Sequence, residues 1–330
     1  MLDYLLLLAG LAGLVIAGDA LVRGAVGLAE RFGIPPLIIG LTIVALGTSA
    51  PELMVSIQAA FEGVADIAVG NVVGSNVANV LLVLGVPALI MATPCNQPGL
   101  KRSTFFMLGV SVLFAAFAFS GRLVLWHGLV FLTLLAVFLY GSYVVARDSD
   151  DGEPDLETID GVEGVPHSLW AALAFFAVGV VGLPFAADLT VDAASGIARD
   201  LGVPEVIIGL TIIAIGTSLP ELVTTVVAAF KRQADVGVGN VIGSNIFNIL
   251  FILGVTATIT PLPIAPQILK LDIWVMLASS AILLPFVLRG ASIGKKTGLV
   301  FLALYTIYLA FLVMLAVHGY PHGGPPHPPR

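Results

Sequence analysis

The sequence predicts an all-α polytopic membrane protein of about ten transmembrane helices, arranged as two inverted five-helix repeats. Three observations predict this fold class: 58% of the 330 residues are hydrophobic and 11% are charged, long apolar runs recur throughout, and one half of the chain repeats the other. With so few polar side chains, a chain of this size cannot cover a soluble globule, so lipid must be its main solvent. Nothing in the composition indicates a nucleic acid partner.

Each helix is predicted from an apolar run bounded by proline, glycine or charged residues, because roughly 20 helical residues cross a hydrocarbon core of about 30 Å. The runs cover residues 3–26, 34–61, 67–92, 103–120, 123–146, 168–195, 203–230, 236–260, 271–288 and 297–317. The first repeat is therefore residues 1–146 and the second is residues 168–317. Residues 147–167 are acidic and lack an apolar period, which predicts a solvated linker, and the tail at 318–330, rich in Pro, Gly and His, is predicted to be disordered.

The internal repeat is strongest between residues 33–85 and 202–254, which align at a constant offset of 169 without a gap. Generic membrane composition would not produce such self-similarity. Because five is an odd number, a second five-helix half that follows directly must insert upside down, so the repeats are predicted to be inverted. About ten Lys and Arg residues fall on one side of this arrangement and four on the other. The positive-inside rule then places both termini outside the cell (inner) membrane and the acidic linker in the cytoplasm.

Each repeat carries a glutamate inside an apolar helix. Glu52 ends the motif GTSAPE at 47–52, and Glu221 ends GTSLPE at 216–221. An ionised carboxylate at this depth costs several kcal/mol unless it is compensated, and neither motif contains a Lys or Arg. A bound cation is the natural partner.

The residues before each glutamate add further oxygen ligands. A proline precedes each glutamate, and a proline inside a helix removes one hydrogen bond, which frees carbonyl oxygens near Gly47 and Gly216. Together with the hydroxyls of Thr48 and Thr217, these groups form the oxygen-only set that calcium and sodium prefer. The alternative is a kinked helix whose hydroxyls bond back to the backbone and whose glutamate bonds a neighbouring helix. Two copies facing each other across a pseudo-two-fold axis favour the ion site.

A second motif, GNVxGSNxxN, also occurs in both repeats. It supplies Ser75 and Asn79 in the first and Ser244 and Asn248 in the second. The i to i+4 spacing places each pair on one face of a helix, where the two side chains can line a cavity together.

Other polar and small residues around these motifs are predicted to have structural roles. Close helix packing is expected at Gly70, Gly74, Gly239 and Gly243. Structural hydrogen bonding and site lining stay equally open for Asn71, Asn76, Asn240 and Asn245. Asp66 and Asp235 are predicted to be helix N-caps, and Asp19 is predicted to form a local ion pair with Arg23.

At these residues the chain resembles the calcium/cation antiporter superfamily and, within it, the prokaryotic type of the sodium/calcium exchanger branch. The two GTSxPE and two GNxxGSNxxN stretches match that family's paired alpha-repeats, and the similar layout covers nearly the whole chain. The resemblance implies that helices 2, 3, 7 and 8 form the ion core and that helices 1 and 6 slide to give alternating access. It implies that Glu52 and Glu221 are shared calcium and sodium carboxylates and that Thr48 and Thr217 give oxygens to calcium. The sodium sites would be completed by Ala45, Ser49, Ser75, Asn79, Ala214, Ser218 and Ser244.

One position departs from the family pattern. Many exchangers of this family have an aspartate where this chain has Asn248, so the core is predicted to hold two carboxylates rather than three. Two charges still neutralise one calcium ion, but the number of sodium ions exchanged stays open.

The sequence thus predicts a secondary active transporter, and not an enzyme, that exchanges calcium for sodium by alternating access. It needs no cofactor besides the transported ions, its partners are the lipid bilayer and inorganic cations, and it works as a monomer. A proton/calcium or other cation/calcium antiporter is the main alternative, and a calcium-selective channel is a further one. An intramembrane enzyme with a serine nucleophile is disfavoured because no His or Lys base lies near either serine.

Overall fold

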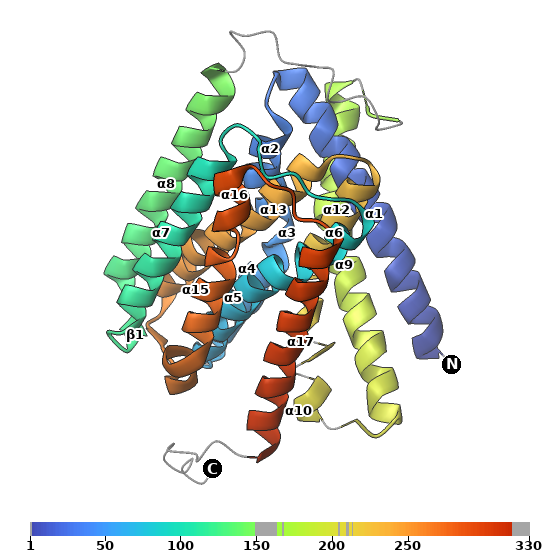
Figure 1. The fold of residues 1–330 in the computed structure, drawn as a ribbon. Coiled ribbons are helices and arrows are strands. Elements are labelled where there is room, and N and C mark those ends of the chain that lie inside the picture. Colours follow the sequence, from blue (N-terminus) through green and yellow to red (C-terminus); the bar gives the residue numbers. More distant parts are fainter. Residues whose placement is uncertain are drawn as a thin grey trace.

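The computed structural model describes residues 2–148, 164–166, 168–203, 205–208, 211–212 and 214–318. Nearly all of these residues are helical (Figure 1). The predicted linker at 147–167 and tail at 318–330 lie almost entirely outside the described residues.

The first half of the chain contains the following elements, where η marks a π-helical turn: α1 (Leu2–Phe32), α2 (Pro36–Ile39), η1 (Gly40–Val44), α3 (Ala45–Thr48), α4 (Ala50–Phe61), α5 (Asp66–Ala78), η2 (Asn79–Val83), α6 (Gly85–Ile90), α7 (Leu100–Ala118), β1 (Arg122–Leu123) and α8 (Leu125–Asp148). The second half contains α9 (Leu169–Asp200), α10 (Glu205–Ile208), α11 (Ala214–Gly216), α12 (Leu219–Phe230), α13 (Ala234–Phe247), η5 (Asn248–Leu253), α14 (Gly254–Ile259), β2 (Leu262–Pro263), η6 (Ile268–Asp272), α15 (Ile273–Ala281), α16 (Leu284–Arg289) and α17 (Lys295–His318).

Eight helices in the described residues are long and apolar enough to cross a membrane, and a ninth span is formed if the bent pair Pro36–Thr48 and Ala50–Phe61 is counted as one. The predicted helix at 203–230 is interrupted by positions outside the described residues, so the count of ten stays a prediction. Two helices extend beyond their predicted C-terminal ends at residues 26 and 195, because α1 continues to Phe32 and α9 to Asp200. Their last turns carry charged residues, which an apolar-run criterion excludes although the helix continues.

The two helices that carry the GNVxGSNxxN motif form the centre of the molecule. In the most apolar stretch of the spans Ile67–Ile90 and Ala234–Ile259, 72% and 78% of residues are buried, against 11% to 44% in the other candidate spans. Figure 1 shows α1 and α9 together along one flank and α7 and α8 along the opposite one. α1 packs against α9 through small residues: a Cβ at Gly24 would overlap the Phe176 amide nitrogen. The family resemblance implied this pairing of helices 1 and 6.

The two halves contact each other through equivalent positions. Leu123 of β1 pairs with Leu262 of β2, and the isolated bridge between Thr93 and Ile293 joins the matching loops with the halves exchanged. Likewise, a Cβ at Gly128 would lie 2.7 Å from the Gly254 carbonyl oxygen, and one at Gly298 would lie 2.7 Å from that of Gly85. In Figure 1, β1 lies at one end of the molecule and the loop between α6 and α7 at the other. These reciprocal contacts describe an inverted pseudo-two-fold arrangement.

Candidate ion-binding site

Both glutamates lie in the first turn of a helix that begins inside the protein. α3 ends at Thr48, Ser49 leaves the helical conformation, and α4 begins at Ala50 with a bend of 42° between the two segments. In the second repeat, α12 begins at Leu219, so Glu221 holds the same position as Glu52. The proline in each first turn has no amide hydrogen to leave unpaired. The positive end of each helix dipole stabilises the carboxylate, and both glutamates are fully buried.

Glu221 is contacted by hydroxyls from both repeats. Its Oε1 accepts hydrogen bonds from Ser49 Oγ at 3.2 Å and from Ser244 Oγ at 3.3 Å. Ser244 Oγ also lies 3.4 Å from Thr48 Oγ1. The GTS segment of the first repeat therefore meets the glutamate and the serine of the second, which joins the two motifs in one site.

Asn240, whose role the sequence did not decide, connects Thr48 to the backbone of Glu221 through hydrogen bonds. Thr48 Oγ1 donates to Asn240 Oδ1 at 3.0 Å, and Asn240 Nδ2 donates to Thr225 Oγ1 at 3.4 Å. Thr225 Oγ1 in turn donates to the Glu221 carbonyl oxygen at 2.7 Å. Asn240 thus has a structural role beside the site.

Glu52 is less constrained than Glu221. Within the described part of the chain, neither of its carboxylate oxygens accepts a hydrogen bond. Ser75, the counterpart of Ser244, lies beside it, and Glu221 is close enough to repel it electrostatically. Asn71 Nδ2 lies 3.4 Å from the Glu52 carbonyl oxygen and donates to it.

Four asparagines join the two central helices across the pseudo-two-fold axis. Asn76 Nδ2 donates to the Asn245 carbonyl oxygen, and Asn245 Nδ2 donates to that of Asn76, each at 3.3 Å. Asn79 Nδ2 donates to Asn245 Oδ1 at 3.1 Å, and Asn248 Nδ2 donates to Asn76 Oδ1 at 3.0 Å. The amide nitrogens of Asn79 and Asn248 are the donors in these bonds, and their Oδ1 atoms have no hydrogen-bond partner among the described residues.

The site is rich in buried oxygens that accept nothing from the described residues. They are Oε1 and Oε2 of Glu52, Oε2 of Glu221, Oδ1 of Asn79 and Asn248, and the hydroxyl oxygens of Ser218 and Thr224. No cluster of three or more His, Cys, Asp or Glu side chains occurs in the described ranges, so the site combines two carboxylates with neutral oxygens. Such a donor set fits a hard cation such as sodium or calcium.

Sequence reasoning missed Thr224. It lies three residues after Glu221 and is fully buried, which places both side chains on one face of α12. Comparison of the repeats gave no signal, because the equivalent residue of the first repeat is Val55. The spacing of three residues from Glu221, which places both side chains on one helix face, would have been enough to predict it.

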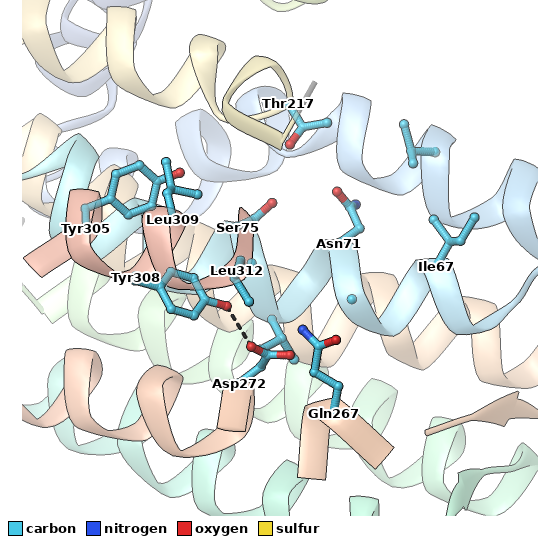
Figure 2. A pocket seen from close by; sticks show the side chains of 14 residues that line it. Ile67, Asn71, Ser75, Thr217, Gln267, Asp272, Tyr305, Tyr308, Leu309 and Leu312 are labelled. Carbon is cyan, nitrogen blue, oxygen red and sulfur yellow. Dashed lines mark hydrogen bonds between the residues drawn. The ribbon is translucent and has the colours of Figure 1, made fainter. Parts of the chain in front are cut away.

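A cavity of about 410 Å³ lies between α5 of the first repeat and, from the second repeat, Thr217, the η6 segment and α17 (Figure 2). Among others, Asn71, Ser75 and Thr217 line it, whereas Asn79 is fully buried and is not part of its lining. The lining also includes Ile67 at the start of α5 and Gln267 just before η6. The cavity therefore approaches the end of the molecule at which β1 and β2 lie.

The glycine pairs differ between the repeats. A Cβ at Gly239 would lie 2.6 Å from the Leu37 carbonyl oxygen, and one at Gly243 would lie 2.5 Å from that of Leu41. These two glycines pack closely against a helix, as predicted. The same prediction was wrong for Gly70 and Gly74 in this conformation, because a Cβ there would meet no atom within 4 Å. Both glycines line the cavity instead.

The remaining predicted residues have mixed outcomes. The Asp19 ion pair with Arg23 is confirmed at 2.7 Å, and Lys231 joins it at 2.6 Å. The N-cap prediction for Asp235 was wrong: α13 begins at Ala234 with no side-chain cap, and Asp235 Oδ1 accepts a hydrogen bond from Gln97 Nε2 at 2.6 Å.

The positions named for sodium in the middle of the helices are also placed. Ala45 is fully buried at the start of α3, and Ser218 is fully buried between α11 and α12. Ala214 begins α11, and its side chain lies outside the described part of the structure, as does that of Asp66.

A family model described as sodium/calcium exchanger protein matches residues 2–144 and 171–314. The chain belongs to the sodium/calcium exchanger family. This exchanger is 38% identical over 317 residues to the inner membrane protein YrbG of Escherichia coli, a match that covers 94% of the chain and 97% of YrbG. It is 36% identical over 355 residues to the sodium/calcium exchanger MaX1 of Methanosarcina acetivorans, which covers 95% of the chain and 98% of MaX1.

A solved structure of the sodium-calcium exchanger NCX_Mj, soaked with sodium and strontium, matches this exchanger with a TM-score of 0.80 and 31% sequence identity. The match covers 94% of this chain and 98% of NCX_Mj. The predicted family and the predicted class, a nearly all-helical multi-pass membrane protein, are therefore confirmed.

Proposed function

We propose that the protein exchanges calcium for sodium across the membrane by alternating access, with Glu52 and Glu221 as ligands shared by the two ions. Its family makes it a cation/calcium antiporter of the exchanger type. We add three points to this family assignment: sodium is the coupling ion, Glu52 and Glu221 bind the ions, and the site opens alternately to the two sides.

The unpartnered buried oxygens around Glu52 and Glu221 carry the proposal. An uncompensated buried carboxylate is very costly, and within the described residues no basic side chain pairs with either glutamate. The amide nitrogens of Asn79 and Asn248 donate hydrogen bonds to the opposite central helix, while their amide oxygens have no partner among the described residues. Bound cations are the natural partners of such acceptors.

The charge of the site supports exchange rather than joint binding. Two carboxylates balance one calcium ion or two sodium ions, and Asn248 adds an oxygen without a third charge. Calcium and sodium therefore compete for the same negative charge. Without a cation, two buried carboxylates repel each other, which opposes a change of state by the empty protein and so limits leak.

The difference between the glycine pairs supports alternating access. The first-repeat helix, residues 36–48, packs on Gly239 and Gly243, while Gly70 and Gly74 face the cavity. In the opposite state, we expect residues 205–217 of the second repeat to pack on Gly70 and Gly74 and the cavity to form at the other glycine pair. Glycines and other small residues bring α1 and α9 close together, a packing that suits a sliding movement.

We place the cavity opening on the outer side of the membrane. α1 begins and α17 ends at the same end of the molecule (Figure 1), and the loops rich in Lys and Arg lie at the other end, which the positive-inside rule assigns to the cytoplasm. Alkaline phosphatase fused after α17 should be active if this orientation holds and inactive if α17 ends in the cytoplasm.

Calcium flux into proteoliposomes under imposed sodium, potassium and proton gradients tests the coupling ion. Uptake should follow the sodium gradient, and uptake that follows only the proton gradient would establish proton/calcium exchange instead. Glu52→Gln should abolish the flux, because it removes half of the charge that holds calcium. Glu62→Gln is the matched control, since Glu62 is an exposed carboxylate at the end of the same helix. Normal flux in Glu52→Gln would contradict the assignment, and currents at conducting rates would indicate a channel.

A further inference from the structure

The wall of the cavity carries a carboxylate, Asp272, that is not one of the two glutamates found in both repeats. Asp272 ends η6, is 7% exposed and lines the cavity together with Ser75 and Thr217. Figure 2 shows it facing the space between α17 and α5, on the opposite wall from Thr217. None of the described residues that line the cavity is Lys or Arg. The charge of Asp272 therefore acts on whatever occupies the cavity.

The scaffold does not require this carboxylate. When the matching sequences LKxx and GLVFL of the two repeats are superposed, the position of Asp272 is held by Ser103 in the first repeat and that of Tyr308 by Phe138. The first repeat builds the same helix packing without an acid. A buried acid that only one repeat carries, and that faces the cavity of that repeat, indicates a role in the cavity.

The described side chains that contact the Asp272 carboxylate are neutral hydrogen-bond donors and not cations. Tyr308 donates its hydroxyl hydrogen to Asp272 Oδ1 at 3.0 Å. Gln267 lies beside the carboxylate and also lines the cavity (Figure 2). A carboxylate together with water provides a weak, exchangeable site for a hard cation.

We propose that Asp272 recruits the transported cation, binding calcium or sodium transiently at the cavity wall before the ion moves past Ser75 to Glu52. This inference rests on the proposed exchange function. Asp272 sets the apparent affinity for calcium on one side of the membrane, whereas Glu52 and Glu221 carry out the exchange. A single negative wall charge raises the local concentration of a divalent cation, and the cavity extends from Asp272 to Ser75.

Asp272→Asn tests the proposal because it removes the charge and keeps the shape. Calcium uptake driven by sodium is measured in right-side-out and in everted membrane vesicles at low ionic strength, with calcium varied on the outer face of each. The half-saturating calcium concentration should rise on the order of ten-fold on the side to which the cavity opens, and not on the other. The effect should lie in that concentration rather than in the maximal rate, and added salt should reduce it.

Two further variants separate the possible outcomes. Asp272→Glu should keep the half-saturating concentration low, because it keeps the charge. Glu62→Gln, at an exposed carboxylate outside the cavity lining, should leave it unchanged, which shows that general surface charge is not responsible. If Asp272→Asn changes neither side, or both sides equally, the inference is wrong even though Glu52→Gln abolishes exchange. If the unaltered protein shows no sodium-driven uptake, the proposed function fails and takes the inference with it.

Discussion

Adding one methyl group at Gly243 should shift the protein away from the conformation seen here. An alanine Cβ at this position would lie 2.5 Å from the Leu41 carbonyl oxygen and 2.7 Å from the Ala45 Cβ. Both atoms belong to, or sit directly on, the backbone of the first-repeat helix, so no flexible side chain can turn aside. The equivalent change at Gly74 would meet no atom within 4 Å, so this conformation should accept it.

The size of the effect follows from the cost of overpacking, which is about 1–3 kcal/mol. A change of this size alters an equilibrium between two states by about 5- to 150-fold. If the second repeat packs on Gly74 in the opposite state, Gly74→Ala should disfavour that state by a similar factor. The two substitutions therefore have opposite signs.

Thiol labelling of the cavity measures the population. A cysteine that replaces Leu309, a half-buried residue of the cavity wall, should react with an impermeant reagent only while the cavity is open. Gly243→Ala should slow its labelling, and Gly74→Ala should keep or increase it, while both slow transport. Gly109→Ala is the control, because that glycine lies in α7 and a Cβ there also meets nothing within 4 Å. If both test variants move labelling in the same direction, the reasoning from pseudo-symmetry is refuted.

Three other predictions concern single residues. Burial raises the pKa of the Cys95 thiol to about 11, so about one thiol in ten thousand is ionised at pH 7. The unaltered protein should therefore resist alkylation at Cys95 at pH 7 and react as the pH approaches 11. Rapid labelling of Cys95 at pH 7 would contradict its burial. Asn76→Ala leaves Asn248 Nδ2 without its acceptor at 3.0 Å and should lower stability by about 1–3 kcal/mol in thermal unfolding, as should the symmetric Asn245→Ala; an effect of only one of the two would contradict their equivalence. Asn248→Asp adds a third carboxylate to the site and should steepen the sodium dependence of calcium flux, whereas an unchanged sodium dependence would show that the added charge is not matched by sodium.

Much of the site could be predicted from the sequence because it depends on repeated local patterns. Glu52 and Glu221 stand out as buried charges in apolar helices, and inversion of the repeats predicts that they meet. The break in the helix at Ser49 follows from Pro51, whose effect on hydrogen bonding is local. The same reasoning gave the ion pair between Asp19 and Arg23, because residues four apart on a helix are neighbours.

The remainder depends on contacts between distant parts of the chain. The partner of Asn248 is Asn76, 172 residues earlier, and no spacing rule connects them. Gly70 and Gly239 are equivalent in the sequence but have different neighbours, because the two repeats differ in conformation in this structure. Asp272 lay outside both motifs, and only the fold brings it to the wall that Ser75 lines.

The pairing of each half with the other has a consequence for how the protein is made. The carbonyl oxygen of Asn76 and the backbone of Thr93 find their partners at Asn245 and Ile293, which the ribosome adds long after the first five helices. Until then those polar groups have only water, lipid or the insertion machinery beside them, and hydrocarbon is the most costly of the three. We therefore expect the first half to stay with the insertion machinery until the second half arrives. The protein should become resistant to proteolysis in one late step rather than helix by helix.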